Sequence, residues 1–355
     1  MRILISGYHG FGNTGDEAVL LATVEGLRQR LPEAEIVVLS ADPQATAAEY
    51  QVEAAERWQH RAIWQELRRA DLLVQGGGSL IQDVTSRHSA LYYLGILHLA
   101  RMARTPYMIF AQGIGPLRSN FLRGLTARNL NRARAITVRD AGSAEMLREW
   151  GVHRPPITVT ADPGLLVQPA GEERRRELLR SLDLAPEQPY MALALREWPG
   201  LAGFLPHLVD LLRARDEAVL VLPFQFEEDL PLALELSRAL PNRVHLPQTS
   251  LHPADYATVI KGARALIAMR LHAMIFAASH STPAVALAYD PKVDAFCHSA
   301  GQPVLQLHEV TRERLEECLA QCLMEEARQR CQERFADLRA AALRNFDILM
   351  QVVGH

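Results

Sequence analysis

Short apolar runs alternate with longer segments of helical spacing along the first half of the chain. Six of these runs predict buried strands: 2–6, 35–40, 71–75, 107–112, 135–140 and 157–162. Helical spacing fills most of the intervals between them, at 16–30, 61–69, 88–104, 119–133 and 141–150. Strands that alternate with helices form parallel sheets covered on both faces, so this half predicts a doubly wound α/β domain.

The same pattern starts again after a proline-rich segment that includes Pro155, Pro156 and Pro163. Five further runs predict strands at 190–195, 218–223, 243–247, 264–269 and 283–289. Helices are expected at 200–215, 228–239, 252–261, 271–280 and 291–300, with a helical tail over 311–350. We therefore expect two Rossmann-like domains facing a cleft, residues 1–165 and residues 166–355, the second with the tail. In such folds ligands bind beyond the carboxyl ends of the strands.

Composition indicates a soluble globular protein. Hydrophobic residues make up 48% of the 355 residues and charged residues 22%. The net charge of −3 gives no global field that would favour nucleic acid. Met1 leads directly into a strand pattern, and no apolar run reaches the ~18 residues that a membrane span needs, so we expect a cytoplasmic protein. The four cysteines lie after residue 296 with no histidine pair at zinc spacing, which predicts free thiols and no metal site.

A glycine loop, G-F-G-N-T-G at 10–15, follows the first strand and opens a helix. This spacing is found in dinucleotide-binding folds, and Asp42 stands near the position of a ribose-binding acid. However, Asp16 and Glu17 occupy the first helical turn, where they would repel a pyrophosphate. The loop therefore fits a neutral ligand with hydroxyl groups. One of the two acids is a candidate base for a sugar hydroxyl, and helix capping is the alternative role.

Two more glycine loops follow later strands. The segment GGGSLIQD at 76–83 lets the backbone approach a ligand and offers hydroxyl, amide and carboxylate groups, although a tight turn with a helix cap would explain it too. The segment AQGIGPL at 111–117 repeats the theme, and a Gly-Pro turn explains it as well. We expect the acceptor to contact residues of the first two loops, namely Gly12, Asn13, Gly15, Gly77, Gly78, Ser79 and Asp83.

Cationic residues follow three other predicted strands. Arg139 ends the run 135–140, where burial requires a partner, and Asp140 could form a structural ion pair with it. Arg270 and His272 follow the run 264–269 at the start of a helix, and Lys292 follows the run 283–289. A guanidinium group beside free helix N–H groups favours a carboxylate or a phosphate.

The ordered set of motifs resembles the polysaccharide pyruvyl transferase family, and most of all its CsaB-like branch. The motifs are GYHGFGNTGDEAVL, GGGSLIQD, AQGIGPL, VRD, ADP, MRLHAMIFA and YDPK, and they span roughly residues 1–300. The resemblance implies a GT-B-like fold and transfer of pyruvate from phosphoenolpyruvate (PEP) onto a sugar as a ketal. For the CsaB-like branch it implies a 4,6-ketal on N-acetylmannosamine of a lipid-linked secondary cell wall polymer precursor, whose product anchors S-layer proteins.

The resemblance also implies roles for individual residues. Arg139, Arg270, Leu271, His272 and Lys292 fall on the positions that bind PEP, and Asp16 and Glu17 fall in the acceptor-side motif. We expect His272 to protonate C3 of PEP or to hold the leaving phosphate, while Asp16 or Glu17 deprotonates the sugar hydroxyl. No metal or redox cofactor is expected, because the cations hold the phosphate of the co-substrate.

A lipid-linked acceptor implies contact with the cytoplasmic face of the membrane. The segment 118–135 carries five arginines with Phe121 and Leu122, so it is either a basic amphipathic surface for anionic lipid or the acceptor diphosphate, or an ordinary solvated helix face. The sequence leaves open whether the chain forms a homo-oligomer. Three other functions remain open: a GT-B glycosyltransferase that uses a nucleotide sugar, a non-catalytic protein that binds sugars or anions, and a dehydrogenase.

Overall fold

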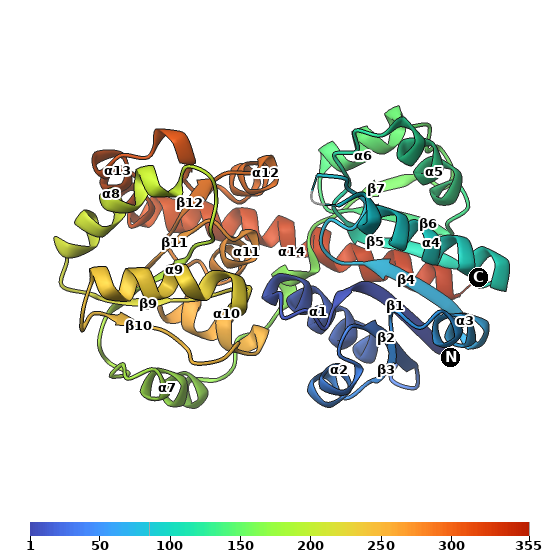
Figure 1. Cartoon of the computed structure of the whole chain (residues 1–355), viewed down its shortest axis with the longest axis horizontal. Helices are drawn as coiled ribbons and strands as arrows, with labels where there is room; N and C mark the ends of the chain where they lie inside the picture. Colours follow the sequence, from blue (N-terminus) through green and yellow to red (C-terminus); the bar gives the residue numbers. More distant parts are fainter. Residues whose placement is uncertain (85, 355) are drawn as a thin grey trace. The chain divides into compact units, whose positions relative to one another are not determined.

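The computed structural model describes residues 1–84 and 86–354, which divide into two compact units. Unit 1 comprises residues 1–11, 16–163 and 339–355, and unit 2 comprises residues 12–15 and 164–338. Each unit is built around one parallel sheet with helices on it (Figure 1). The division differs from a single cut after residue 165, because the end of the last helix belongs to unit 1 and the tip of the first glycine loop belongs to unit 2.

In unit 1 the described residues form seven parallel strands in the order β3-β2-β1-β4-β5-β6-β7. The strands are β1 (Arg2–His9), β2 (Glu35–Ser40), β3 (Glu53–Glu56), β4 (Leu72–Gly76), β5 (Tyr107–Gln112), β6 (Ala135–Val138) and β7 (Ile157–Val159). The strand order reverses between β1 and β4, which pair directly with each other. The loops after these two strands therefore flank the place where Rossmann-like sheets bind ligands.

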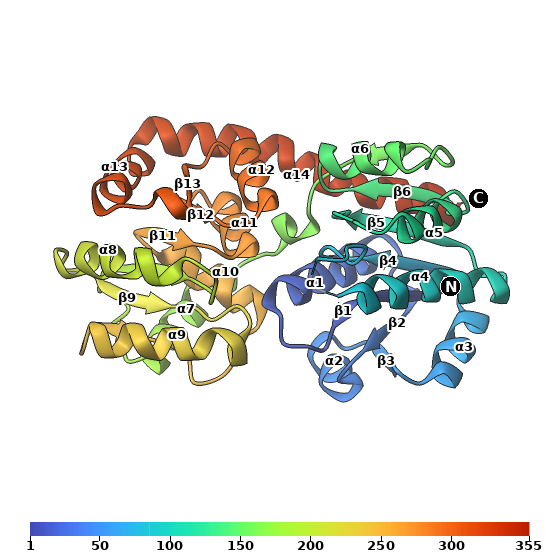
Figure 2. The ribbon, with the colours of Figure 1, turned by 45° about the horizontal axis from the view of Figure 1, so that its top comes forward.

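Helices cover both faces of this sheet (Figure 2). They are α1 (Thr14–Arg30), α2 (Pro43–Tyr50), α3 (His60–Arg69), α4 (Arg87–Ala103), α5 (Asn120–Leu130), α6 (Ala141–Glu149) and the end of α14 (Glu325–Val353). Alternate residues of a strand point to opposite faces. On β5, Tyr107 and Ile109 pack into the core under α3 to α6, whereas Phe110 packs against Phe346 of α14, with ring centroids 5.2 Å apart.

Unit 2 repeats this topology, and its described residues form six parallel strands in the order β10-β9-β8-β11-β12-β13. The strands are β8 (Tyr190–Ala194), β9 (Ala218–Val221), β10 (Val244–His245), β11 (Ala265–Ala268), β12 (Ala284–Ala288) and β13 (Val304–Gln306). The helices are α7 (Glu172–Ser181), α8 (Leu201–Arg213), α9 (Phe226–Ala239), α10 (Pro253–Gly262), α11 (Leu271–Ser279), α12 (Pro291–Ala300), α13 (Arg312–Cys322) and the start of α14. The strand order reverses between β8 and β11.

Every run predicted as a strand forms one, and the predicted fold of two doubly wound α/β sheets is confirmed. Two strands, β3 and β13, two α-helices, α2 and α7, and two 3-10 helices, at Pro163–Leu166 and Leu307–Glu309, were not predicted. Within the described residues, no helix combines the length and the apolar character needed to cross a bilayer. All four cysteines are free thiols.

Candidate functional site

In unit 1 the first two glycine loops meet beyond the carboxyl ends of β1 and β4. Gly78 has φ +56°, and a Cβ atom at this position would overlap Oδ1 of Asp16. Glycine is therefore required here for two reasons: the backbone is left-handed, and the Asp16 carboxylate approaches too closely for a side chain. The structure thus brings Asp16 against the second loop.

Glu17 is the more deeply buried of the two neighbouring acids, with 9% of its surface exposed. Its Oε1 accepts a hydrogen bond from the Gly10 amide at 2.8 Å, and its Oε2 accepts one from the Tyr50 hydroxyl at 2.9 Å. Burial raises the pKa of Glu17 to about 7, although both hydrogen bonds oppose the shift. Glu17 therefore ties the first loop to α2 and is partly protonated near neutral pH.

His9 lies at the end of β1 between the two loops and is almost fully buried. Its ring stands against Gly7 and is 3.7 Å from the Cβ that a side chain at Gly77 would have. Neither ring nitrogen has a hydrogen-bond partner within the described residues. Burial, helped by the charge of Arg57, lowers the pKa of His9 to about 3. His9, which was not predicted from the sequence, is therefore a neutral imidazole buried between the first two glycine loops.

Arg139 joins the second loop to the segment after β7. Its Nη1 forms an ion pair with Oδ2 of Asp162 at 2.7 Å, and its Nη2 donates to Ser79 Oγ at 3.0 Å. Both charged side chains are almost fully buried. The suggested pairing with Asp140 is wrong, because Asp140 instead caps α6 by accepting from the Ser143 amide at 2.7 Å.

Asp83 binds the backbone directly after the third glycine loop. Its carboxylate accepts hydrogen bonds from the Arg118 amide at 2.8 Å and from the Ser119 amide at 3.0 Å. These bonds hold the turn that leads into α5. The structure therefore gives Asp83 a local structural contact in addition to the acceptor contact that we expected.

An aromatic cluster stands at the same edge of the sheet and was not predicted. Arg57 follows β3 and is buried; its Nη1 donates to the Gly7 carbonyl at 2.8 Å and its Nη2 to the Tyr93 hydroxyl at 3.1 Å. Trp58 is 58% exposed, and its ring lies 5.0 Å from the Arg57 guanidinium. We define the aromatic cluster as Tyr8, Phe11, Trp58, Tyr92 and Tyr93 around Arg57.

In unit 2, Arg270 follows β11 and is fixed by a buried ion pair. Its Nε donates to Oδ2 of Asp229 on α9 at 3.1 Å, and its Nη2 donates to Oδ1 of the same carboxylate. Asp229 also accepts from the Phe224 and Gln225 amides at 3.0 Å each. Nη1 of Arg270 forms no hydrogen bond within the described part of the chain. Asp229, which the sequence analysis missed, therefore orients Arg270 and leaves one of its nitrogens available to a ligand.

The tip of the first glycine loop lies in this unit with His272. The Thr14 amide donates to the Phe224 carbonyl at 2.8 Å, and Asn13 Nδ2 donates to Gln225 Oε1 at 3.2 Å. A Cβ atom at Gly15 would overlap the His272 ring. We expected Gly12, Asn13 and Gly15 on the acceptor side, but the structure places them in the unit that carries His272 and Arg270.

The remaining predicted residues follow neighbouring strands of the same sheet. Leu271 is the buried first residue of α11. Lys292 is partly exposed, and its Nζ lies 3.2 Å from Oδ2 of Asp290. Each predicted cation, Arg139, Arg270 and Lys292, therefore has a carboxylate beside it.

Arg196 follows β8 and was not predicted. Its Nη1 donates to the Tyr289 hydroxyl at 3.2 Å, and its guanidinium stacks over Trp198 and Tyr289. Within the described residues it forms no ion pair, and its buried Nε has no hydrogen-bond partner. Arg196 could have been found from the sequence, because it directly follows the predicted strand 190–195. That strand is one of the two between which the strand order reverses.

This edge of unit 2 has the features of an anion site. Arg196, Arg270 and Lys292 follow β8, β11 and β12, which are neighbours in the sheet. The backbone N–H groups at the start of α11 have no side-chain cap. Guanidinium groups beside an open helix N-terminus bind carboxylate and phosphate. No group of three or more metal-binding side chains occurs in the described ranges.

Solved structures with the same architecture include several sugar-nucleotide enzymes. A UDP-GlcNAc 2-epimerase from Methanocaldococcus jannaschii superimposes with a TM-score of 0.67 at 13% identity, covering 99% of each chain. Anabaena HepE in complex with UDP-glucose gives 0.62 at 13% identity, covering 100% of this chain and 98% of the other. Escherichia coli ADP-heptose lipopolysaccharide heptosyltransferase II gives 0.56 at 18% identity, covering 92% and 99%. At these identities the matches establish a GT-B-like fold and nothing further.

A protein-family model identifies the chain more specifically. The model described as polysaccharide pyruvyl transferase matches residues 13–291. The matched range includes the end of the first glycine loop with Asp16 and Glu17, the second glycine loop, and the segments that carry Arg139, Arg270 and His272. Lys292 lies one residue beyond it. The chain belongs to the polysaccharide pyruvyl transferase family of enzymes.

Proposed function

We propose that the protein transfers pyruvate from PEP onto two hydroxyl groups of a sugar and forms a cyclic ketal. The observation that carries the proposal is the anion site of unit 2 in a chain of this family. PEP carries a carboxylate and a phosphate close together, and its negative charge calls for several cations. Arg270, Arg196 and Lys292 supply them, and Leu271 is assigned to the donor site by the motif alone.

Asp229 and His272 complete the proposed donor site. Asp229 holds the Arg270 side chain in one orientation, so that its Nη1 is positioned in advance to donate hydrogen bonds to PEP. His272 protonates C3 of PEP or holds the phosphate as it leaves. We also assign Arg139 to PEP binding, on the resemblance of its VRD motif to that of the family.

For the acceptor we propose the first two glycine loops, with Asp16 of unit 1 as the base. Both carboxylate oxygens of Glu17 accept hydrogen bonds from loop and helix, whereas Asp16 lies against Gly78 in the second loop. A base must reach the hydroxyl that it deprotonates. Glu17 is therefore assigned to holding the loop, and Asp16 to proton transfer.

The exposed ring of Trp58 extends the acceptor site. Sugars present C–H faces that pack on aromatic rings, and Trp58 lies at the carboxyl edge of the sheet near Phe11. His9 stays neutral in this site and adds no charge that would favour an anion.

The atoms of the reaction balance without an oxidant or a metal. A sugar hydroxyl loses its proton and its oxygen bonds to C2 of PEP, while C3 gains a proton and becomes a methyl group. The bond from C2 to the phosphate oxygen breaks, and the second hydroxyl oxygen bonds to C2. The second hydroxyl proton leaves with the phosphate. The products are the pyruvate ketal and hydrogen phosphate.

For the finer identity of the acceptor we rely on the resemblance of the motifs to the CsaB-like branch. We propose N-acetylmannosamine of a lipid-linked secondary cell wall polymer precursor, modified at O4 and O6 on the cytoplasmic face of the membrane. The product would then serve S-layer anchoring.

The test is release of inorganic phosphate from PEP by the purified protein in the presence of a panel of sugar acceptors. We expect release with an acceptor that has two suitably placed hydroxyls and none without acceptor, with the ketal identified by mass spectrometry. Calorimetry with PEP and with UDP-sugars covers the main alternative. Binding of a UDP-sugar with no PEP-dependent phosphate release would overturn the proposal in favour of a glycosyltransferase.

A further inference from the structure

One continuous stretch of the chain carries only positive charge. From Val84 to Arg139 inclusive the sequence has nine arginines and no aspartate or glutamate, although acidic residues outnumber basic ones, 41 to 38, in the whole chain. The stretch contains α4 and α5, which pack against each other in unit 1. A chain with a small excess of negative charge thus carries a concentration of positive charge on one pair of helices and the segments around them.

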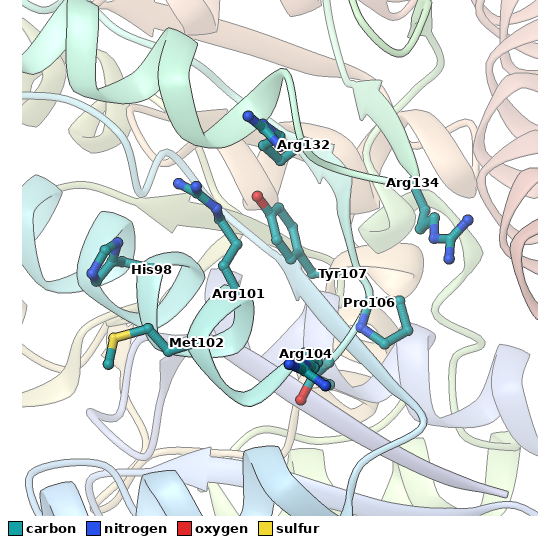
Figure 3. Close-up of a pocket in the computed structure, with 9 residues that line it drawn as sticks. His98, Arg101, Met102, Arg104, Pro106, Tyr107, Arg132 and Arg134 are labelled. Carbon is teal, nitrogen blue, oxygen red and sulfur yellow. The ribbon is translucent and has the colours of Figure 1, made fainter.

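A pocket of about 460 Å³ opens where α4 and α5 end. Arg101 and Arg132 reach toward the hydroxyl end of Tyr107, which lies at the base of the pocket (Figure 3). The Tyr107 hydroxyl donates to the Asn129 carbonyl at 2.6 Å, so its own hydrogen bond is already made. The lining contains no carboxylate and consists of His98, Arg101, Met102, Arg104, Thr105, Pro106, Tyr107, Arg132 and Arg134.

The four arginines of the pocket are not neutralised by the protein. Within the described residues none of Arg101, Arg104, Arg132 and Arg134 forms an ion pair. Asp71 lines the adjoining hollow with Arg134, and its carboxylate accepts a hydrogen bond from the Arg2 amide at 2.7 Å. Arg101 and Arg132 both reach toward Tyr107, and an anion bound there would relieve the repulsion between these like charges (Figure 3). Guanidinium groups are well suited to phosphate oxygens.

Apolar side chains accompany these charges along both helices. On α4, Leu91, His98 and Met102 are seven and four residues apart, so they lie on one side of the helix, and Met102 reaches the pocket. On α5, Phe121 and Arg128 are likewise seven residues apart, and that side continues to Arg132 in the pocket. Leu91, Met102 and Phe121 are 42%, 60% and 71% exposed. Each helix therefore has, along one side, a stripe of apolar and basic side chains that ends at the pocket.

We propose that this face of unit 1, the pocket with the two stripes, docks on an anionic lipid bilayer and takes a lipid phosphate group into the pocket. Basic residues attract an anionic membrane surface, and exposed Leu, Met and Phe side chains enter the headgroup region. Free phosphate would need only the arginines and would leave the apolar stripes unexplained. Nucleic acid would also match the charge, but it offers no apolar layer for Met102 and Phe121. The inference does not depend on the transfer reaction.

The experiment is flotation of the whole protein with vesicles of phosphatidylcholine alone and of phosphatidylcholine with roughly 30 mol% phosphatidylglycerol. We expect flotation only with the anionic vesicles, and weaker flotation as salt rises to about 0.5 M. The double variant Arg101→Gln/Arg132→Gln should lower the partition coefficient about 10- to 30-fold. The matched control is Arg328→Gln/Arg330→Gln, which removes two exposed arginines from α14.

The separate variant Met102→Ser should also weaken flotation, without any change in charge. Circular dichroism confirms that each variant is folded, and all the substituted side chains except that of Arg101 are exposed. Equal flotation with neutral vesicles, no flotation, or the same loss in the control would overturn the proposal.

Two further measurements separate other phosphate sources. Calorimetric binding of inorganic phosphate that the double variant loses, with no flotation of the wild type, would assign the pocket to free phosphate and overturn docking. Binding of a DNA duplex in preference to anionic vesicles would overturn it in favour of nucleic acid.

Discussion

At the scale of single residues, Glu17 makes the stability of the protein depend on pH. Its pKa is about 7 in the fold against a reference value of 4.5. Between these values the folded state keeps a proton that the unfolded chain has lost, so the free energy of unfolding falls as pH rises through this window. In Glu17→Gln the amide keeps the contacts without a charge. We predict that the variant matches wild type below pH 4.5 and exceeds it at pH 8 by on the order of 3 kcal/mol at most.

Urea denaturation of both proteins between pH 4 and 8 measures this difference, and the comparison cancels the titration of all other groups. Parallel stability curves for wild type and variant would show that Glu17 ionises normally. The Tyr50→Phe variant is a useful companion, because it removes one hydrogen bond to Glu17 and leaves the carboxyl buried.

Asp229 offers a second test at this scale. Its carboxylate is buried and bonds to both Arg270 and the backbone after β9. Removing one partner of a buried ion pair leaves an uncompensated charge and costs about 3–5 kcal/mol, so Asp229→Ala should fold poorly. Asp229→Asn keeps one acceptor oxygen for the backbone amides but no longer holds Arg270 through two oxygens, and we predict that it raises KM for PEP at least tenfold with a smaller change in kcat. The control is Glu227→Gln, an exposed acid on the same helix. An unchanged KM for PEP in Asp229→Asn would remove the positioning role.

At the scale of elements, the sequence predicts those parts of the fold that bury apolar side chains. The missed strand β3 reads EAAE and lies at the edge of its sheet, where it pairs only with β2, so it has no apolar run. The missed helix α7 has the sequence EERRRELLRS. Its two buried leucines are too few among the charged residues to give a recognisable apolar periodicity. The elements that carry the site were predictable because loops after parallel strands gather at one edge.

The partners within the site were not predictable in the same way. Asp162 and Asp229 lie 23 and 41 residues from the arginines that they bind. Nothing local marks an acid as the partner of a distant cation, and the adjacent Asp140 was the obvious but wrong candidate for Arg139. The aromatic cluster was missed for the same reason, since its rings come from the ends of β1 and β3 and from α4.

The aromatic cluster leads to a prediction at the scale of elements. Trp58 projects from the segment between β3 and α3, while Arg57 anchors this segment to β1 through the Gly7 carbonyl. Trp58→Ala should therefore leave the anchor in place and remove only the exposed ring. We predict that KM for the acceptor rises about tenfold, since an aromatic contact of this kind contributes about 1 kcal/mol or more, while KM for PEP stays within twofold. Trp58→Phe should recover much of the loss. Equal changes in both KM values would point to altered folding of the loop.

At the scale of the whole molecule, the two sheets repeat one topology, and the chemistry that each collects at its carboxyl edge differs. Unit 2 carries three of the four proposed donor cations, with Arg196 and Arg270 after the two strands where the order reverses, and Arg139 lies in unit 1. Unit 1 carries Asp16 and the second glycine loop at the equivalent place, while the tip of the first glycine loop belongs to unit 2. The repeated fold explains why both sets follow strands, and the difference in charge explains why they suit different substrates.

This division predicts that donor binding and proton transfer can be lost separately. Asp16→Asn should bind PEP with a Kd within about twofold of wild type, because it removes no cation, yet should release phosphate 10²–10⁴-fold more slowly, as expected for loss of a general base. Arg270→Gln should do the reverse and weaken PEP binding at least tenfold. Calorimetry with PEP and the phosphate-release assay measure the two effects on the same preparations. Loss of PEP binding in Asp16→Asn would contradict the division, because the acid would then be supporting the donor site, and the base would have to be sought elsewhere.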